Sequence, residues 1–244
     1  TTCDVLVVGG GPAGLMAALE AAESGARVLL VEQDSDVGGS ILSERGPAAE
    51  EWNTWVVQSV SRLQSMGNVT VLLRTTCSGV YDHRVLNAVE RLSHSVSGPA
   101  PILRERYWRI RAERIVLATG AIEQPAVFPY NDLPGVMLAG SLRQYLNRYA
   151  VACGRRVAIV TNDDEAYRTA IDLADAGIAV AAIVDSRVHR RPGADDTLPS
   201  LARERGLPIL EGSRVRAARG RSQVQGLTVS AANGETTEVE CDAV

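Results

Sequence analysis

The segment that most constrains the fold is residues 5–39, which read VLVVGGGPAGLMAALEAAESGARVLLVEQDSDVGG. An apolar run at 5–8 enters a glycine-rich turn, a helical pattern follows, and a second apolar run at 28–31 ends on Glu32. A strand, a glycine turn, a helix and a second strand that ends in an acid is the order of a dinucleotide-binding βαβ unit. The order therefore predicts an α/β fold with a nucleotide site near its N-terminus.

Each glycine of the G-x-G-x-x-G pattern has a separate physical task. Gly9 permits the tight turn, Gly11 has no side chain to block a pyrophosphate, and Gly14 lets the helix lie close to the strand. The start of the helix offers free N–H groups and a partial positive charge to phosphates. Glu32 is expected to accept hydrogen bonds from an adenosine ribose. The cofactor-binding residues predicted in this unit are Gly9, Gly11, Pro12, Ala13, Gly14, Glu32 and Gln33. The alternative is a glycine turn in an α/β domain that binds nothing.

Two further segments carry small residues that suit close approach to a dinucleotide. Gly38 and Gly39 follow the second strand, where a glycine pair lets the backbone pass near the phosphates; an ordinary turn is the alternative. Residues 115–120 read IVLATG, and a buried strand that ends in Ala-Thr-Gly is typical of oxidoreductases with two dinucleotide-binding domains. The cofactor-binding residues predicted in these segments are Gly39, Ser40, Ala118, Thr119 and Gly120.

Hydrophobic periodicity predicts the remaining elements of the first half. Helices are expected over 12–24, 48–66 and 141–149. The segment 75–113 is expected to hold short strands, the last over 108–111, and a turn should lead from it to a strand over 114–118.

A second βαβ unit follows, but its glycine pattern is lost. Strands over 157–160 and 180–184 flank a helix over 165–176, and the second strand ends on Asp185. The residues that replace the three glycines are Thr161, Asp163 and Ala166.

The start of that second helix is acidic. Asp163, Asp164 and Glu165 should cap the helix and repel a pyrophosphate, since one carboxylate about 4 Å from a phosphate charge costs about 4 kcal/mol at an effective dielectric of about 20. We expect two Rossmann-like domains, the second degenerate: a nucleotide-binding domain over 1–145 and a ligand-free domain over 146–244.

Composition excludes several other classes of function. The net charge is −4 and no long basic run occurs, which argues against a nucleic-acid partner. The apolar runs are strand-sized, so no membrane span is expected. The four cysteines (Cys3, Cys77, Cys153 and Cys241) form no C-x-x-C, which excludes a redox dithiol or a zinc ribbon in this sequence and fits a reducing cytoplasm. The three histidines have no metal-ligand spacing, so no metal site is predicted.

The sequence resembles the α subunit of heterotetrameric sarcosine oxidase over nearly its whole length. The segments that carry the resemblance are CDVLVVGGGPAGL at 3–15, TTCSGVYDH at 75–83, RAERIVLATGAIEQPAVFPYNDLPGVMLAG at 111–140, YLNRYAV at 145–151 and RRVAIVTNDDEAYRTAIDLADAGI at 155–178. A TND-type turn in place of the second glycine pattern is peculiar to that subunit and its relatives.

The resemblance implies a role inside a larger complex. That complex oxidises sarcosine to glycine, reduces O₂ to peroxide and passes a one-carbon unit to tetrahydrofolate. Its α subunit holds NAD⁺, its β subunit holds FAD, FMN lies between the two, and γ and δ subunits complete it. No amine-oxidising residue maps onto this chain, so no catalytic residue is predicted and the chain alone is expected to be inactive.

Two alternatives stay open at this point. Related α subunits of opine, proline and cyanide-forming dehydrogenases hold FAD or another adenine nucleotide in the same place. A non-catalytic assembly module, stabilised by its nucleotide, is the other alternative. The family's subunit also continues past a CDAV-like segment into a strand that returns to the first domain, so we expect this chain to be a piece of a longer subunit that lacks the return strand.

Overall fold

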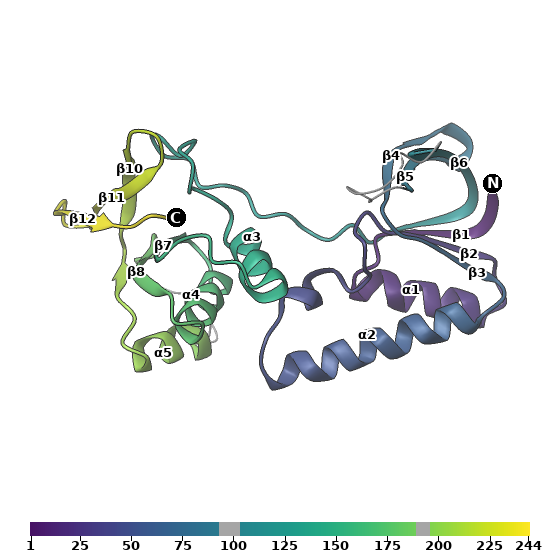
Figure 1. Cartoon of the computed structure of the whole chain (residues 1–244), viewed down its shortest axis with the longest axis horizontal. Helices are drawn as coiled ribbons and strands as arrows, with labels where there is room; N and C mark the ends of the chain where they lie inside the picture. The colour runs from purple at the N-terminus through teal and green to yellow at the C-terminus, as the bar shows by residue number, and fades with distance from the viewer. Residues whose placement is uncertain (93–102, 189–195) are drawn as a thin grey trace. The chain divides into compact units, whose positions relative to one another are not determined.

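The computed structural model describes residues 1–92, 103–188 and 196–244, and the chain divides into two compact units, residues 1–121 and 122–244. Each unit is an α/β assembly of its own (Figure 1). Residues 122–145, which the sequence analysis assigns to the first domain, fall in the second compact unit. The physical reason is packing, because Leu142 and Leu146 belong to the hydrophobic core of the second unit.

The first unit contains a six-stranded sheet in the order β3-β2-β1-β6-β5-β4. Its strands are β1 (Thr2–Val8), β2 (Val28–Val31), β3 (Val69–Leu72), β4 (Thr75–Tyr81), β5 (Val85–Arg91) and β6 (Glu105–Leu117). Its helices are α1 (Pro12–Glu23) and α2 (Pro47–Ser65), with short 3-10 segments at Gly39–Ser43 and Asp82–Arg84. Strands β1, β2 and β3 run parallel, which confirms the predicted βαβ unit.

Strand β6 differs from the sequence prediction. It is one continuous strand of 13 residues, so the predicted turn between 111 and 114 is wrong. Its first half pairs antiparallel with β5, and its second half pairs parallel with β1, with Arg111 taking part in both ladders. The strand continues because Ala112 lies in the same buried cluster as Ile110, and no Gly or Pro interrupts the alternation. Residues 93–102 of the predicted excursion lie outside the described residues.

Two cores hold the first unit together, one on each face of the parallel strands. One face packs against α1 and α2 through Leu15, Leu19, Val56 and Leu63. The other face, which includes Leu6 and Val31, packs with side chains of β5 and β6. Leu15 is completely buried, and truncating such a leucine to alanine typically costs about 2–5 kcal/mol.

The second unit repeats the βαβ arrangement and adds an antiparallel sheet. The parallel strands β7 (Arg156–Thr161), β8 (Ala179–Asp185) and β9 (Ile209–Glu211) lie in that order. The antiparallel strands are β10 (Arg214–Gly220), β11 (Val224–Ser230) and β12 (Thr236–Glu240). The helices are α3 (Ala139–Arg143), a π-helical turn at Gln144–Arg148, α4 (Glu165–Asp175) and α5 (Thr197–Glu204).

The helix predicted over 141–149 is therefore a short α-helix followed by a π-helical turn. A polar cluster fixes this segment to α4. Arg143 Nε and Asn147 Nδ2 both donate to the same Oδ2 of Asp172, at 2.8 and 2.7 Å. Side-chain contacts of this kind between distant residues cannot be read from the periodicity of the segment.

The last residues of the chain extend the parallel sheet of the second unit. Ala243 bridges to Val157 in parallel, and the N–H of Ala158 donates to the carbonyl of Ala243 at 2.9 Å. Cys241 precedes this bridge and is buried in the adjoining core.

Cys241 is expected to resist alkylation in the folded protein. Burial, and then the neighbouring Asp242 carboxylate, raise the pKa of the Cys241 thiol to about 11. At pH 8 only about one thiol in a thousand is then ionised, and the thiolate is the form that reacts. Iodoacetamide labelling at pH 8, read by mass spectrometry, should leave Cys241 unmodified until urea unfolds the chain. Equal labelling rates before and after unfolding would contradict this.

Candidate functional site

The glycine turn after β1 is built so tightly that two of its positions accept only glycine. Gly9 has a φ of +105°, and a Cβ added there would overlap the carbonyl of Ala118. A Cβ on Gly14 would overlap the carbonyl oxygen of Gly9. Glycine at these positions brings the start of α1, the turn and the end of β6 into contact.

Gly11 is glycine for a different reason. Its φ of −72° and ψ of −177° suit any residue, and the nearest described atom to an added Cβ is the Cα of Gly39, at 3.9 Å. A Cβ at Gly11 would therefore make only an ordinary van der Waals contact within the protein. Helix α1 begins at Pro12 without a side-chain cap from the described residues, so its first N–H groups are left for a ligand. This arrangement suits a pyrophosphate.

The two other predicted segments lie against this turn. The N–H of Gly38 donates to the carbonyl of Gly10 at 2.8 Å, and a Cβ on Gly39 would lie 2.9 Å from the Cα of Gly11. The N–H of Ala118 donates to the carbonyl of Val8 at 2.8 Å, and Gly120 has a φ of +72°. The structure thus brings together the predicted residues of all three segments. The exposed members of the set are Ala13, Gln33, Gly39, Ser40, Thr119 and Gly120.

Glu32 lies at the end of β2 and is only 8% exposed. Its Oε2 accepts the N–H of Gly10 at 2.5 Å, and its Oε1 accepts the N–H of Asp34 at 2.8 Å. A carboxylate offers about four acceptor positions, so about two stay available for ribose hydroxyls among the described residues. Glu32 therefore also holds the glycine turn in place, a role that the sequence analysis does not anticipate.

Replacing Glu32 with alanine is expected to have two effects. Dinucleotide affinity should fall about ten- to a hundredfold through loss of a charge-assisted hydrogen bond, and discrimination against a 2′-phosphate should relax. The free energy of unfolding should also fall by about 1–3 kcal/mol, because the N–H groups of Gly10 and Asp34 lose a buried acceptor. Calorimetric titration with NAD⁺ and NADP⁺, together with urea unfolding, measures both.

The matched control is Glu20→Ala, which removes an exposed acid from α1. It should leave both the affinity and the unfolding free energy unchanged within error. Unchanged NAD⁺ affinity in Glu32→Ala would show that Glu32 does not touch the ribose.

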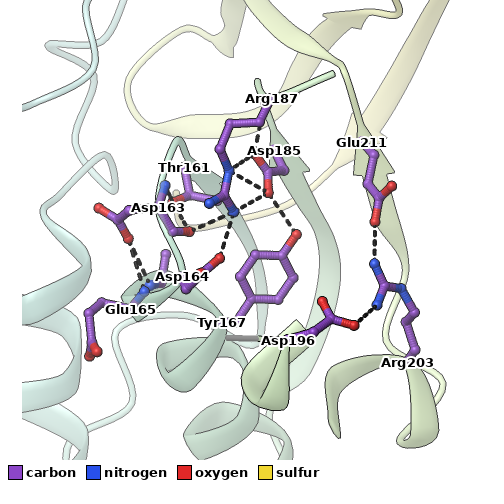
Figure 2. A network of polar contacts seen from close by, with 11 residues as sticks. Thr161, Asp163, Asp164, Glu165, Tyr167, Asp185, Arg187, Asp196, Arg203 and Glu211 are labelled. Carbon is purple, nitrogen blue, oxygen red and sulfur yellow. Dashed lines mark hydrogen bonds and ion pairs between the residues drawn. The ribbon is translucent and has the colours of Figure 1, made fainter. Parts of the chain in front are cut away.

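The corresponding turn of the second unit is occupied by side chains. Of the three acids predicted to cap α4, Asp163 does so: its Oδ1 accepts the N–H groups of Glu165 and Ala166 at 3.0 and 3.4 Å, while the N-cap residue Asp164 makes no side-chain cap among the described residues. Asp164 instead forms an ion pair with Arg187 at 2.9 Å. Figure 2 shows this network at the ends of β7 and β8.

Asp185, the counterpart of Glu32, is the centre of that network. It accepts hydrogen bonds from the Tyr167 hydroxyl at 2.8 Å and from Arg187 Nη2 at 2.6 Å. Burial raises the pKa of Asp185, but the bonds from Arg187 and Tyr167 outweigh burial and hold this pKa below its ordinary value. Burial, and then the hydrogen bond to Asp185, raise the pKa of the Tyr167 phenol.

Neither Tyr167 nor Arg187 was predicted from the sequence as part of this network, although the position of each in the sequence gives a signal. Tyr167 stands at the helix position of the buried Leu15 and adds a polar tip there, and Arg187 follows Asp185 by two residues, as Asp34 follows Glu32.

Across residues 1–92, 103–188 and 196–244, no three or more His, Cys, Asp or Glu side chains are arranged to hold a metal ion. Within the same ranges, no helix has both the length and the apolar character that crossing a bilayer requires.

The chain matches a model of the family described as pyridine nucleotide-disulphide oxidoreductase over residues 3–244. It is 52% identical over 190 residues to the sarcosine oxidase subunit alpha of Rhizobium meliloti (strain 1021), covering 76% of this chain and 19% of that protein. It is 43% identical over 216 residues to the sarcosine oxidase subunit alpha of Corynebacterium sp. (strain P-1), covering 87% and 22%. The chain thus spans about a fifth of the length of these relatives.

A likeness to solved structures supports the fold. The L-proline dehydrogenase from P. horikoshii aligns with a TM-score of 0.69 at 24% identity, over 98% of this chain and 41% of that one. The two βαβ units, and the glycine turn with the segments 38–40 and 118–120 against it, agree with these similarities. The chain therefore belongs to the pyridine nucleotide-disulphide oxidoreductase family and is a homologue of sarcosine oxidase α subunits.

Proposed function

We propose that this chain is the dinucleotide-holding part of a sarcosine oxidase-type α subunit and that its first unit holds NAD. The observation that carries the proposal is the glycine turn. The lack of a side chain at Gly11, the uncapped start of α1 and the remaining acceptor capacity of Glu32 fit the pyrophosphate and ribose of a dinucleotide. The 52% identity to a sarcosine oxidase subunit alpha supports the assignment to this complex.

In this proposal the chain binds and orients a nucleotide and does not itself oxidise sarcosine, the amine substrate of the complex. The N–H groups at the start of α1 bind the pyrophosphate, Glu32 holds the ribose, and the Ala118–Gly120 segment lies against the turn. Sarcosine oxidation to glycine, with O₂ and tetrahydrofolate as acceptors, takes place in the whole complex with β, γ and δ subunits. In that complex the β subunit carries FAD, and FMN lies between the α and β subunits. The scattered cysteines support a cytoplasmic location.

Identification of the bound nucleotide tests the proposal directly. The protein is purified without added nucleotide and denatured, and the released ligand is identified by mass spectrometry. NAD⁺ without a yellow flavin absorption band is the expected result. Released FAD would favour the second candidate, an opine oxidase-type α subunit, to which the chain is 30% identical over 191 residues. No adenine nucleotide at any occupancy would overturn the proposed role of the first unit.

The purified chain is expected to produce no peroxide from sarcosine, because no amine-oxidising residue of the family maps onto its sequence. A peroxidase-coupled assay measures this, with added hydrogen peroxide as the positive control. Turnover by the chain free of partner subunits would show that the amine chemistry has been assigned to the wrong subunit.

A further inference from the structure

We infer that the nucleotide site of the second unit is closed by the chain's own side chains. Asp163 takes the place of a phosphate at the start of α4, and Arg187 together with Tyr167 takes the place of ribose hydroxyls on Asp185. The second unit would then keep the dinucleotide-binding fold by supplying an internal substitute for the ligand. This inference concerns the second unit alone and stands apart from the nucleotide proposed for the first.

The phosphate position is filled by a carboxylate. Asp163 Oδ1 accepts the N–H groups of Glu165 and Ala166, which are the groups that an anion at the start of α4 would need. The loop that presents Asp163 is fixed by Thr161, whose Oγ1 accepts the N–H of Asp163 and donates to its carbonyl, both at 3.0 Å. The same position in the first unit is Gly11, and α1 begins there without a side-chain cap from the described residues.

The ribose position is saturated as well. Asp185 Oδ1 accepts the backbone N–H and the Nε of Arg187 at 3.0 and 2.9 Å. Its Oδ2 accepts the Tyr167 hydroxyl at 2.8 Å and Arg187 Nη2 at 2.6 Å. These four donors fill the roughly four acceptor positions of a carboxylate, so none is left for a ribose hydroxyl. Glu32 in the first unit receives two donors from the described residues, the N–H groups of Gly10 and Asp34, and keeps capacity for a ligand.

The Arg187 guanidinium also spans the path between these two positions. Its Nη2 reaches Asp164 Oδ1 at 2.9 Å and the carbonyl of Asp163 at 3.2 Å, while the same side chain holds Asp185 (Figure 2). A dinucleotide joins its ribose and pyrophosphate across this interval, from the end of the second strand to the start of the helix. In the second unit the side chain of Arg187 makes that connection.

The phosphate position lies next to a cavity. A cavity of about 820 Å³ lies beside the turn, and its lining includes Thr161, Asp163 and Ser186. Ligand sites for small molecules typically have volumes of about 300–1,000 Å³. A small anion therefore has space beside Asp163, and the barrier to it is the occupied N–H groups and the acidic charge.

Residue-resolved NMR on the full chain tests the inference, with inorganic pyrophosphate as the probe. In the wild type, pyrophosphate should leave the amide signals of Glu165 and Ala166 unshifted at concentrations that shift Ala13 and Gly14. In Asp163→Gly, the same two amides should shift saturably, with an affinity at least tenfold higher than in the wild type. Asp196→Gly, which removes the N-cap acid of α5, is the matched control and should leave these amides unchanged.

Two results would overturn the inference. One is a pyrophosphate-dependent shift of Glu165 and Ala166 in the wild type as large as that of Ala13 and Gly14. The other is no gain of binding in Asp163→Gly. If the nucleotide proposal for the first unit fails, the amide signals of Ala13 and Gly14 do not shift with pyrophosphate. The two failures are therefore distinguishable.

A second measurement needs no variant. Hydrogen exchange should be at least tenfold slower at the amides of Glu165 and Ala166 than at Ala13 and Gly14 in nucleotide-free protein, because Asp163 already accepts the former pair. Added NAD⁺ should slow exchange at Ala13 and Gly14 only. Equal exchange at both helix starts would contradict the internal substitute.

Discussion

Gly11→Val abolishes dinucleotide binding and leaves the fold intact: this is the expected result. An added Cβ makes only an ordinary van der Waals contact, with the Cα of Gly39 at 3.9 Å, and the backbone conformation of Gly11 is ordinary, so the backbone accepts a side chain at this position. The valine would instead fill the space that a pyrophosphate needs at the start of α1. We expect an affinity loss of at least about a hundredfold, or roughly 3 kcal/mol, for NAD⁺ and for any other ligand that contains ADP.

Calorimetric titration with NAD⁺ gives the affinity, and thermal unfolding without ligand gives the stability. Gly67→Ala is the matched control, because no described atom lies within 4 Å of an added Cβ there and Gly67 is remote in sequence from the turn. It should bind NAD⁺ like the wild type. Gly11→Val with wild-type affinity would mean that the pyrophosphate does not pass beside Gly11.

Removal of Arg187 should have the largest effect on stability. Arg187→Met leaves the carboxylate of Asp185, whose side chain is 2% exposed, without its cationic partner. Removing one partner of a buried ion pair typically costs about 3–5 kcal/mol, and we expect a loss near the lower end because the Arg187 side chain is 22% exposed. Urea unfolding at pH 7 measures the loss.

The pH dependence of this loss has a definite sign. The pKa of Asp185 is lowered in the folded protein, so its contribution to stability is present above the unfolded-state pKa of about 3.9 and is lost as the pH falls through the folded-state value. The difference between Arg187→Met and the wild type should therefore shrink as the pH falls below about 4. A deficit that stays constant from pH 7 to pH 3 would contradict the ion pair as its source.

The sequence offers an internal control for this experiment. The three tryptophans, Trp52, Trp55 and Trp108, all lie in the first unit, so tryptophan fluorescence follows that unit while far-UV circular dichroism follows both. The variant should shift the circular dichroism transition, which includes the unfolding of the second unit. Arg168→Met removes an arginine from the ion pair with Glu165 on α4 and should cost less than about 0.5 kcal/mol.

The sequence predicted those features that depend on local pattern. The βαβ units could be predicted from the apolar runs and the glycine positions. A turn that needs a positive φ and a close backbone approach requires glycine, and this requirement is visible in the sequence at Gly9 and Gly14. The loss of the second glycine pattern was equally visible. Asp163 could be assigned as a helix cap because capping involves residues two or three positions apart.

Features that depend on tertiary contacts could not be predicted in the same way. The continuation of β6 through Ala112 depends on strands far away in the sequence, to which no local turn signal points. The second role of Glu32 and the closure of Asp185 by Tyr167 and Arg187 depend on side-chain directions across two or three elements. The place of residues 122–145 depends on which core Leu142 and Leu146 enter.

The pairing of β1 with β6 has a consequence for how the chain is made. β1 is synthesised before β6, yet residues 111–117 of β6 are its neighbour in the sheet, and Thr2 pairs with Arg111. At about 5–20 residues per second, roughly 5–20 s pass between synthesis of the two strands. During that time the edge of the apolar strand β1 that later pairs with β6 stays unpaired, whereas β4 and β5 can already form a local hairpin. The nascent chain is thus most prone to mispairing before residue 117 emerges, and slow translation across residues 9–117 should lower the yield of folded protein.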